Sequence, residues 1–427
     1  MPKMRDIRFT PLLLQQAELL LAELLRSPFA ADSVVSRHFR QHRELGHKDR
    51  AFIAETVYAV LRHKRSLSAR CLDDVTSRRL VLSALIFGQG LNRRELEPVL
   101  SESEGEWLAR AKAVRLDELP AAVRLDLPDW LYEALAGQYA ADELDELEKL
   151  VNSLNQAAPL DLRVNTQKTG RDAVLEALHA EDVGARACQY SPLGIRLDDK
   201  PSLSRHPLFL DGSVEVQDEG SQLLGFLLQP KRGEMVADFC AGAGGKTLLL
   251  GAMMHSQGRL YAFDVAEKRL AKLKPRLARS GLSNVHPVRI DSENDIKVKR
   301  LAGKLDRVLV DAPCSGLGTL RRNPDLKWRH TPESIAELTV KQASILRAAA
   351  KLVKPGGRLV YATCSLLAGE NDGVVDGFLA GHPEFAPLSA GELLRGQGIG
   401  VDAGERLRLT PDRHGTDGFF ATVMERR

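Results

Sequence analysis

A glycine-rich run directly after an apolar run constrains the fold of this chain more than any other feature. Residues 235–240 are apolar enough to predict a buried strand, the next seven are Ala-Gly-Ala-Gly-Gly-Lys-Thr, and a helical pattern follows. Glycine lets the backbone approach a ligand closely, and the start of a helix offers unpaired N–H groups. Strand, glycine-rich turn and helix together predict a doubly wound α/β sheet with a nucleotide-type ligand at the turn.

The end of this run, Gly245-Lys246-Thr247, resembles a phosphate-binding P-loop. That motif requires a further glycine at the position of Cys240, so a nucleoside triphosphate is disfavoured. The loop alone leaves a nicotinamide cofactor and S-adenosylmethionine equally open.

Aspartates follow three further apolar runs, at residues 260–263, 287–290 and 306–310. They are Asp264, Asp291 and Asp311, and Asp238 lies in the first run. Open α/β sheets bind ligands at the carboxyl ends of their strands, so four aspartates in register predict a site there, although each alone could cap a helix. We expect Asp264 to accept hydrogen bonds from ribose hydroxyls and Asp291 to meet an adenine amino group.

Two cysteines fall at the same predicted edge of the sheet. Cys314 lies in residues 311–316 (Asp-Ala-Pro-Cys-Ser-Gly), after the fourth strand, and Cys364 in residues 361–365 (Tyr-Ala-Thr-Cys-Ser), after the fifth. A cysteine is most often a small buried hydrophobe. These two lie beyond strand ends, where side chains face the cleft, so we expect them to take part in the chemistry.

At these motifs the sequence closely resembles the Sun family of RNA 5-methylcytosine methyltransferases, in particular its RsmB-type bacterial members. The resemblance runs from about residue 128 to the C-terminus. Residues 216–218, 238–241, 244–247, 311–316, 321–325, 327–328, 363–365, 370–371 and 415–420 carry it. One departure is Ala243, where the family usually has proline. We expect the loop to keep its binding role with altered rigidity, which puts cofactor affinity in question.

The resemblance implies S-adenosylmethionine as cofactor and a catalytic role for four side chains. Cys364 would add to C6 of a cytosine and so make C5 nucleophilic, and Cys314 would assist product release. Asp311 is placed to hydrogen-bond or protonate the N3/N4 edge of the base, and Lys246 to favour a thiolate or contact the base. The target cytosine must be unpaired or flipped out. The expected cofactor-binding residues are Cys240, Ala241, Gly242, Ala243, Gly244, Gly245, Lys246, Asp264, Asp291 and Asp311.

Basic segments suggest where RNA binds. Arg321, Arg322, Lys327 and Arg329 surround Trp328 just after the Pro-Cys motif, and cations beside an aromatic ring suit single-stranded RNA. Core packing is the equally open alternative for Trp328. Residues 1–70 carry 13 Lys/Arg against 7 Asp/Glu, whereas residues 101–150 carry 5 against 13. The first segment suits a phosphate backbone and the second would repel one, although solvated helix faces explain either.

The chain is longer than one hydrophobic core usually organises, and its pattern changes twice. Apolar residues recur at helical spacing over residues 8–150. A strand at 160–164, a helix at 170–180 and a strand at 194–197 predict a small module, and strands alternate with helices from 216 onward. We predict an all-α domain that resembles NusB (1–140), an α+β module that resembles an RNA-recognition domain (141–210) and a Rossmann-like α/β class I methyltransferase domain (211–427).

Five scattered cysteines without CxxC spacing argue against a zinc site or a disulfide framework and fit a reducing cytoplasm. Gln and Glu residues interrupt the leucine-rich N-terminus, which predicts an amphipathic helix rather than a signal peptide or membrane span. We expect a cytoplasmic monomer that acts without a metal on RNA, and from the resemblance on 16S ribosomal RNA. Transfer RNA as substrate, a non-catalytic role in ribosome assembly and, more remotely, an NAD-dependent oxidoreductase stay open.

Overall fold

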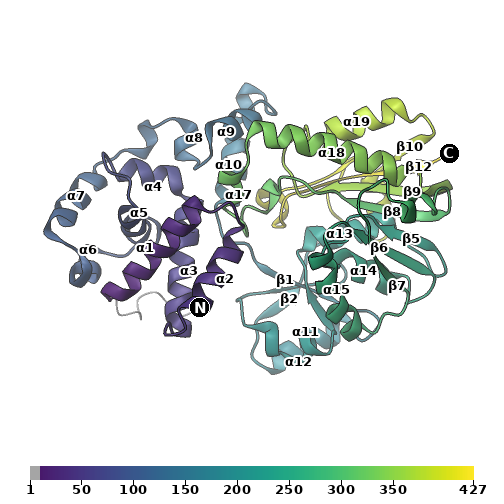
Figure 1. Cartoon of the computed structure of the whole chain (residues 1–427), viewed down its shortest axis with the longest axis horizontal. Helices are drawn as coiled ribbons and strands as arrows, with labels where there is room; N and C mark the ends of the chain where they lie inside the picture. Colours follow the sequence, from purple (N-terminus) through teal and green to yellow (C-terminus); the bar gives the residue numbers. More distant parts are fainter. Residues whose placement is uncertain (1–9) are drawn as a thin grey trace. The chain divides into compact units, whose positions relative to one another are not determined.

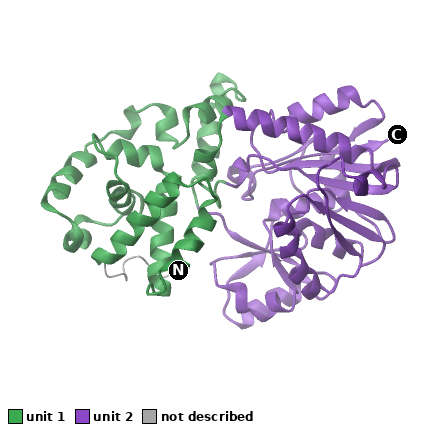
Figure 2. Ribbon diagram, viewed as in Figure 1, with its two compact units in different colours: residues 1–156, 320–331 green, residues 157–319, 332–427 purple. Residues whose placement is uncertain are grey.

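The computed structural model describes residues 10–427, which form two compact units (Figure 2). Unit 1 comprises the chain up to residue 156 together with residues 320–331, and unit 2 comprises residues 157–319 and 332–427. The short segment 320–331 therefore leaves the second unit and packs within the first. Residues 1–9, part of the predicted basic N-terminal segment, lie outside the described residues.

Unit 1 is helical, as predicted (Figure 1). Thr10 caps its first helix by accepting a hydrogen bond from the N–H of Leu13 at 3.2 Å, and proline at the first helical position suits this start. One face of that helix is buried, which confirms the amphipathic prediction. The helices are α1 (Pro11–Arg26), α2 (Ala31–Gln41), α3 (His47–Arg62), α4 (Lys64–Arg70), α5 (Ser77–Ser83), α6 (Arg93–Leu96), α7 (Glu102–Lys112), α8 (Ala121–Arg124), α9 (Asp129–Ala136), α10 (Leu144–Leu154) and α17 (Leu326–Arg329).

Unit 2 begins with a small antiparallel sheet of order β2-β3-β1-β4. Its strands are β1 (Leu160–Val164), β2 (Ala185–Ala187), β3 (Gly194–Leu197) and β4 (Val214–Val216), with helices α11 (Arg171–Ala180) and α12 (Pro207–Leu210). The two predicted strands and the predicted helix are present. Strands β2 and β4 were not predicted, because three residues are too few to show an alternating pattern.

The larger sheet has the order β10-β12-β9-β8-β5-β6-β7, with β11 paired to β12. Strands β5 to β9 are parallel, whereas β10, β11 and β12 run antiparallel to their neighbours. Its strands are β5 (Met235–Asp238), β6 (Arg259–Asp264), β7 (Val285–Arg289), β8 (Leu305–Asp311), β9 (Val353–Thr363), β10 (Phe385–Leu388), β11 (Leu407–Leu409) and β12 (Phe419–Arg426). The Rossmann-like core is thus confirmed, and the sheet is mixed rather than wholly parallel.

Alternate residues of the central strands enter two cores, one on each face of the sheet. Val236 and Leu309 pack with helices α13, α14 and α15, while Ala237 and Val308 pack with α18 and α19. This burial on both faces explains why the strands are almost continuously apolar. The helices of unit 2 that follow the small module are α13 (Glu219–Leu228), α14 (Gly245–Met253), α15 (Glu267–Ser280), α16 (Ile296–Lys299), α18 (Pro332–Ala350), α19 (Asp372–Gly381), α20 (Ala390–Arg395) and α21 (Pro411–His414).

The predicted division at residues 140/141 and 210/211 stays a prediction. In the structure α10 extends to Leu154 within unit 1, and β4 at Val214–Val216 completes the small sheet. Over residues 10–427, no helix combines the length and apolar character that a bilayer crossing requires.

Candidate active site

The glycine-rich turn joins β5 to α14 in a conformation that only glycine adopts easily. Gly242 and Gly244 have φ angles of +56° and +85°. A Cβ atom on Gly244 would stand 2.2 Å from Cδ1 of Leu273, so a side chain there would clash as well as strain the backbone. The N–H of Gly244 donates to the carbonyl of Ala241 at 2.8 Å, which closes the turn.

A cavity of about 370 Å³ lies at the carboxyl edge of the sheet beside this turn. It lies within the size range of sites for small organic ligands. Among its lining residues are Cys240, Asp264, Asp311, Cys314 and Cys364. Strand ends distant in sequence therefore bring two of the four predicted acids, Asp264 and Asp311, and both thiols to one cavity.

Asp264 links the cavity to the glycine-rich turn. Its side chain is 5% exposed, and its two oxygens accept hydrogen bonds from the N–H of Gly242 and the N–H of Ala266, both at 2.7 Å. Each carboxylate oxygen retains a lone pair that can accept a ribose hydroxyl. Apolar walls from Phe239 and Ile290 suit an adenine ring. The residues present thus fit S-adenosylmethionine.

Asp238 adds a second buried acid. One of its oxygens accepts a hydrogen bond from the Thr247 hydroxyl at 2.7 Å, while the other is buried without a hydrogen-bond partner in the described part of the chain. Burial raises the pKa of Asp238 to about 6. Asp238 therefore lies behind the glycine-rich turn and is not among the residues that line the cavity.

The structure does not bring Asp291 to the cavity. Its side chain is 81% exposed and lies 3.2 Å from Arg289 in an ion pair. Glu293 lines the cavity instead and accepts a hydrogen bond from Ser344 at 2.6 Å. Adenine recognition by Asp291 stays a prediction without support from this geometry, and the cavity offers Glu293 and the Ile290 side chain at that strand end.

The two thiols are in direct contact. The sulfur atoms of Cys314 and Cys364 lie 3.4 Å apart. The hydrogen bond to Cys364, together with burial, raises the pKa of Cys314 well above its ordinary value. Either thiol can donate to the other, so the contact brings together the two predicted cysteines without deciding which of them is the nucleophile.

Lys246 and Asp311 form an ion pair at the same edge, with Nζ and Oδ2 2.6 Å apart. Burial lowers the pKa of Lys246, but the Asp311 charge and hydrogen bond outweigh it and leave the pKa raised, with a further contribution from Cys364. The ammonium also lies 5.7 Å from the centre of the Phe419 ring. The ion pair thus fixes a cation at the edge of the sheet where the two cysteines lie.

Glu370 was noted in the sequence only as part of the motif at residues 370–371, and no role was predicted for it. Glu370 is fully buried, and its carboxylate accepts hydrogen bonds from the N–H and hydroxyl of Ser315, at 2.8 and 2.5 Å, and from the Ser365 hydroxyl. The Gln342 amide donates to the same carboxylate at 2.9 Å. Because each serine follows one of the cysteines, Glu370 holds both thiol-bearing turns.

The residues expected to bind RNA around Trp328 serve packing in unit 1. Lys327 is fully buried and donates to the carbonyl of Arg62 at 2.7 Å and to Asn155 Oδ1 at 2.8 Å, while the Trp328 indole donates to the carbonyl of Leu61 at 2.8 Å. Burial lowers the pKa of Lys327 to about 7. These contacts favour the packing alternative for Trp328, and they bury Lys327, which was expected to bind RNA. Arg321 is also buried, at 7% exposed, which does not support the predicted RNA contact. Arg322 is partly exposed, and its role in RNA binding stays a prediction.

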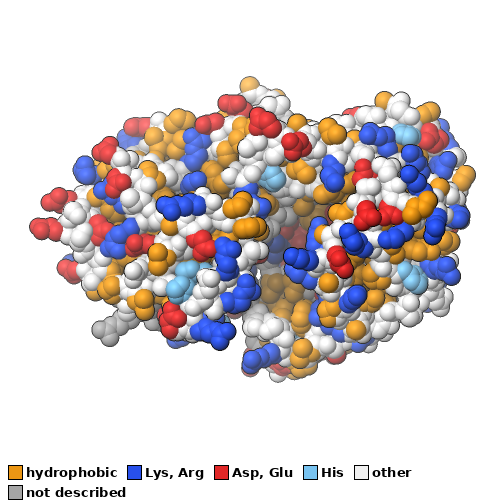
Figure 3. All heavy atoms as spheres, viewed as in Figure 1, with side chains coloured by type: hydrophobic (Ala, Val, Ile, Leu, Met, Phe, Trp, Pro, Cys, Tyr) orange, Lys and Arg blue, Asp and Glu red, His pale blue; other side chains and the backbone are white. Residues whose placement is uncertain are grey.

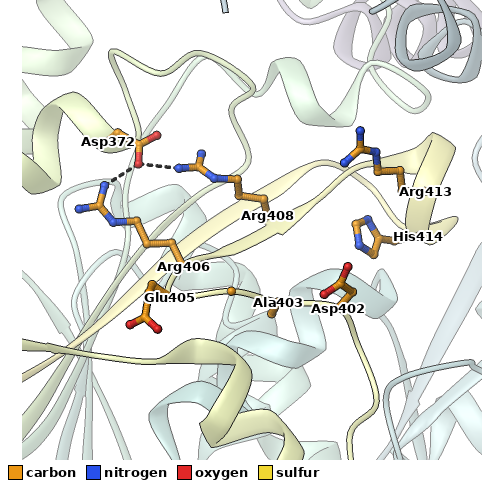
Figure 4. A pocket seen from close by; sticks show the side chains of 9 residues that line it. Asp372, Asp402, Ala403, Glu405, Arg406, Arg408, Arg413 and His414 are labelled. Carbon is orange, nitrogen blue, oxygen red and sulfur yellow. Dashed lines mark hydrogen bonds and ion pairs between the residues drawn. The ribbon is translucent and has the colours of Figure 1, made fainter. Parts of the chain in front are cut away.

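A larger cavity, of about 520 Å³, lies elsewhere in unit 2 (Figure 4). Arg406 and Arg408 line it, and both donate to Asp372, so one carboxylate already binds two of its cations. The cavity also contains Arg413 and His414 but no thiol. The smaller cavity, which is lined by both thiols, is therefore the candidate active site although it is not the larger of the two.

Metal-ligand types cluster once among the described residues, at Asp161, Cys188 and Glu219. Arg196 donates to both oxygens of Asp161 at 2.7 and 2.9 Å and lies 3.6 Å from Glu219. The Arg196 guanidinium therefore already binds one carboxylate and lies close to the other. Burial raises the pKa of Cys188, which favours the protonated thiol over the thiolate that binds metals. A metal-independent reaction stays a prediction.

Residues 225–425 match the family described as 16S rRNA methyltransferase RsmB/F, and residues 127–204 match the ferredoxin-like domain of RsmF/B-like methyltransferases. A probable ribosomal RNA small subunit methyltransferase B of Synechocystis sp. is 32% identical, and the alignment covers 96% of this chain and 99% of that protein. A protein of the same description from Bacillus subtilis is 34% identical over 70% of this chain and 66% of its own length. Among solved structures, that of the protein PH0851 has a TM-score of 0.80 at 26% identity and covers 98% of this chain and 100% of its own.

Proposed function

The chain belongs to the RsmB/F family of 16S rRNA methyltransferases, and on this basis we propose that it methylates C5 of one cytosine in small-subunit ribosomal RNA through a covalent enzyme–base adduct. It is an enzyme that uses S-adenosylmethionine and acts on RNA. The contact between Cys314 and Cys364 at the cofactor cavity is the single observation that carries the covalent mechanism.

The first step belongs to Cys364. Its thiolate forms a bond to C6 of the cytosine, which moves electron density to C5 and makes that carbon nucleophilic. S-adenosylmethionine, when bound, supplies the methyl group that C5 receives. A basic group at the site then accepts the C5 proton, the electrons of that C–H bond re-form the C5–C6 double bond, and the bond between sulfur and C6 breaks, so that Cys364 leaves as a thiolate and the base is aromatic again. Cys314 assists this release, because its sulfur lies beside the leaving thiol.

Asp311 and Lys246 stabilise charge in the ring as the thiolate adds. The Asp311 carboxyl group meets the N3/N4 edge of the cytosine, and the ammonium 2.6 Å away fixes its orientation. Glu370 keeps the two cysteine turns in register. Since the thiol and the methyl donor act at adjacent ring atoms, the base must leave any stack, and unpaired or flipped cytosines are the substrates.

The oligomeric state of the enzyme, its need for a metal ion and its location are further parts of the proposal. We propose a monomer that needs no metal ion and acts in the cytoplasm, where free thiols persist. All five cysteines are free in the structure, as thiol chemistry requires. Arg322, which is partly exposed, remains a proposed contact to the RNA backbone.

A methylation assay tests the substrate assignment. Purified protein with tritium-labelled S-adenosylmethionine should label protein-free 16S ribosomal RNA at one cytosine, identified by bisulfite sequencing, and should leave a transfer RNA pool unlabelled. Cys364→Ala provides the inactive control. Labelling of transfer RNA alone would move the substrate to that class. Binding of both ligands without labelling of either RNA would favour a non-catalytic assembly factor.

A further inference from the structure

The glycine-rich turn, residues 241–245, is held from outside the cavity by arginines tied to the small sheet. Arg163 on β1 is 2% exposed, and its Nη1 donates to the carbonyl of Gly245 at 2.6 Å. The same nitrogen donates to Gln217, which follows β4. Neither side chain is among those that line the cofactor cavity. The first strand of the small sheet thus touches the start of α14 directly.

Arg276 on α15 makes a second connection. Its Nη1 donates to the carbonyl of Ala243 at 2.7 Å, while Nε and Nη2 donate to Glu215 at 3.1 and 2.8 Å. Glu215 lies on β4 and is only 4% exposed. The guanidinium therefore bridges the centre of the turn to a buried carboxylate of the small sheet, in the forked geometry that arginine allows and lysine does not.

The turn needs such support, because its own sequence does little to fix it. Ala243 stands between two glycines in left-handed conformations, and glycine is the residue with the widest backbone freedom. Two carbonyls held by charged donors restrict that freedom before any ligand arrives. A turn fixed in advance binds with a smaller loss of conformational entropy.

We propose that Arg276 and Arg163 are positioning residues, which hold the carbonyls of Ala243 and Gly245 and so fix the turn for S-adenosylmethionine. The small sheet thereby contributes to cofactor affinity without touching the cofactor. This inference rests on the proposed function only in taking S-adenosylmethionine as the ligand. Loss of the contact should weaken cofactor binding while RNA affinity and the maximal rate stay close to those of the unaltered enzyme.

The chain offers a matched control for Arg276. Arg279 lies one helical turn further along α15 and donates to the other oxygen of Glu215 at 3.2 and 2.7 Å, but it packs on Phe209 and makes no contact with the turn. The two side chains are similarly exposed, at 20% and 22%. Arg276→Gln and Arg279→Gln each remove one guanidinium that binds Glu215. Only Arg276→Gln also removes the hydrogen bond to the Ala243 carbonyl.

Titration calorimetry of the full-length variants with S-adenosylmethionine tests the proposal. Arg276→Gln should raise Kd roughly ten-fold, as the loss of one charged hydrogen bond suggests, and Arg279→Gln should stay within about two-fold of the unaltered enzyme. In steady state, Arg276→Gln should raise KM for the cofactor and leave kcat at saturation unchanged. Amide exchange at residues 241–245 should quicken in that variant only.

Equal Kd values for the two variants would overturn the proposal, as would a fall in kcat at saturating cofactor with KM unchanged. If Arg276→Gln fails to fold, Arg276→Lys replaces it: lysine keeps a cation opposite Glu215 but cannot bridge to Ala243 as well, so the loss of affinity should persist. Restored affinity in that variant would also contradict the proposal. An unaltered protein that binds no S-adenosylmethionine would refute the proposed function instead.

Discussion

At the scale of single residues, one buried carboxylate sets the geometry of two thiols that lie 50 residues apart in the sequence. Glu370 binds the serine that follows each cysteine, and the cysteine sulfurs meet at 3.4 Å. The sequence predicted the thiols because they follow strand ends. It could not predict that Glu370 joins them, since four donors from three separate segments converge on it only in the folded chain.

Glu370→Gln should therefore damage catalysis more than cofactor binding. A glutamine has one acceptor oxygen, and its NH2 group would face donors, so both cysteine turns should shift. Displacements near 1 Å can cost about 10²-fold in rate. We expect kcat to fall by roughly that factor in the methyl-transfer assay, with the Kd for S-adenosylmethionine unchanged. A kcat equal to that of the unaltered enzyme would show that Glu370 does not set the thiol geometry.

At the scale of elements, strand ends were more predictable than the segments between them. Apolar runs marked β5, β6, β7, β8 and β9. Asp238, Asp264 and Asp311 lie at the carboxyl ends of β5, β6 and β8 as expected, whereas Asp291, after β7, is exposed away from the cavity. The antiparallel strands β10, β11 and β12 carry no signal of direction, because an apolar strand has the same composition either way. The charges of the loop 321–329 predicted RNA binding. Lys327 is buried by acceptors 172 and 265 residues distant in sequence, which no local pattern reveals.

The depressed pKa of Lys327 predicts how stability depends on pH. Its pKa is about 7 in the folded protein against 10.5 in an unfolded chain, so the unfolded state binds more protons between these values. The free energy of unfolding should rise with pH across this window, by at most about 1.4 kcal/mol per pH unit from this group. Urea unfolding of unit 1 in the full-length protein should show a flatter pH dependence in Lys327→Met than in the control Lys112→Met. Identical slopes in both variants would contradict a desolvated ammonium.

At the scale of the whole chain, the fold class followed from the sequence, whereas its division into units did not. A helical unit, a small α+β sheet and a Rossmann-like sheet were all expected, and each is present. The return of residues 320–331 to unit 1 depends on tertiary contacts. The distribution of charge did not mark a surface for RNA, because basic and acidic side chains are both spread over the face seen in Figure 3.

The covalent role of Cys364 is the central claim, and a denaturing gel tests it most directly. Each cysteine variant is incubated with labelled 16S ribosomal RNA and S-adenosylmethionine, and protein-bound label is measured after denaturation. Cys314→Ala should accumulate a denaturant-resistant complex, because addition proceeds while release stalls. Cys364→Ala and the double variant should bind RNA without forming that complex. Trapping by Cys364→Ala but not by Cys314→Ala would exchange the two roles, and trapping by neither would contradict the covalent mechanism.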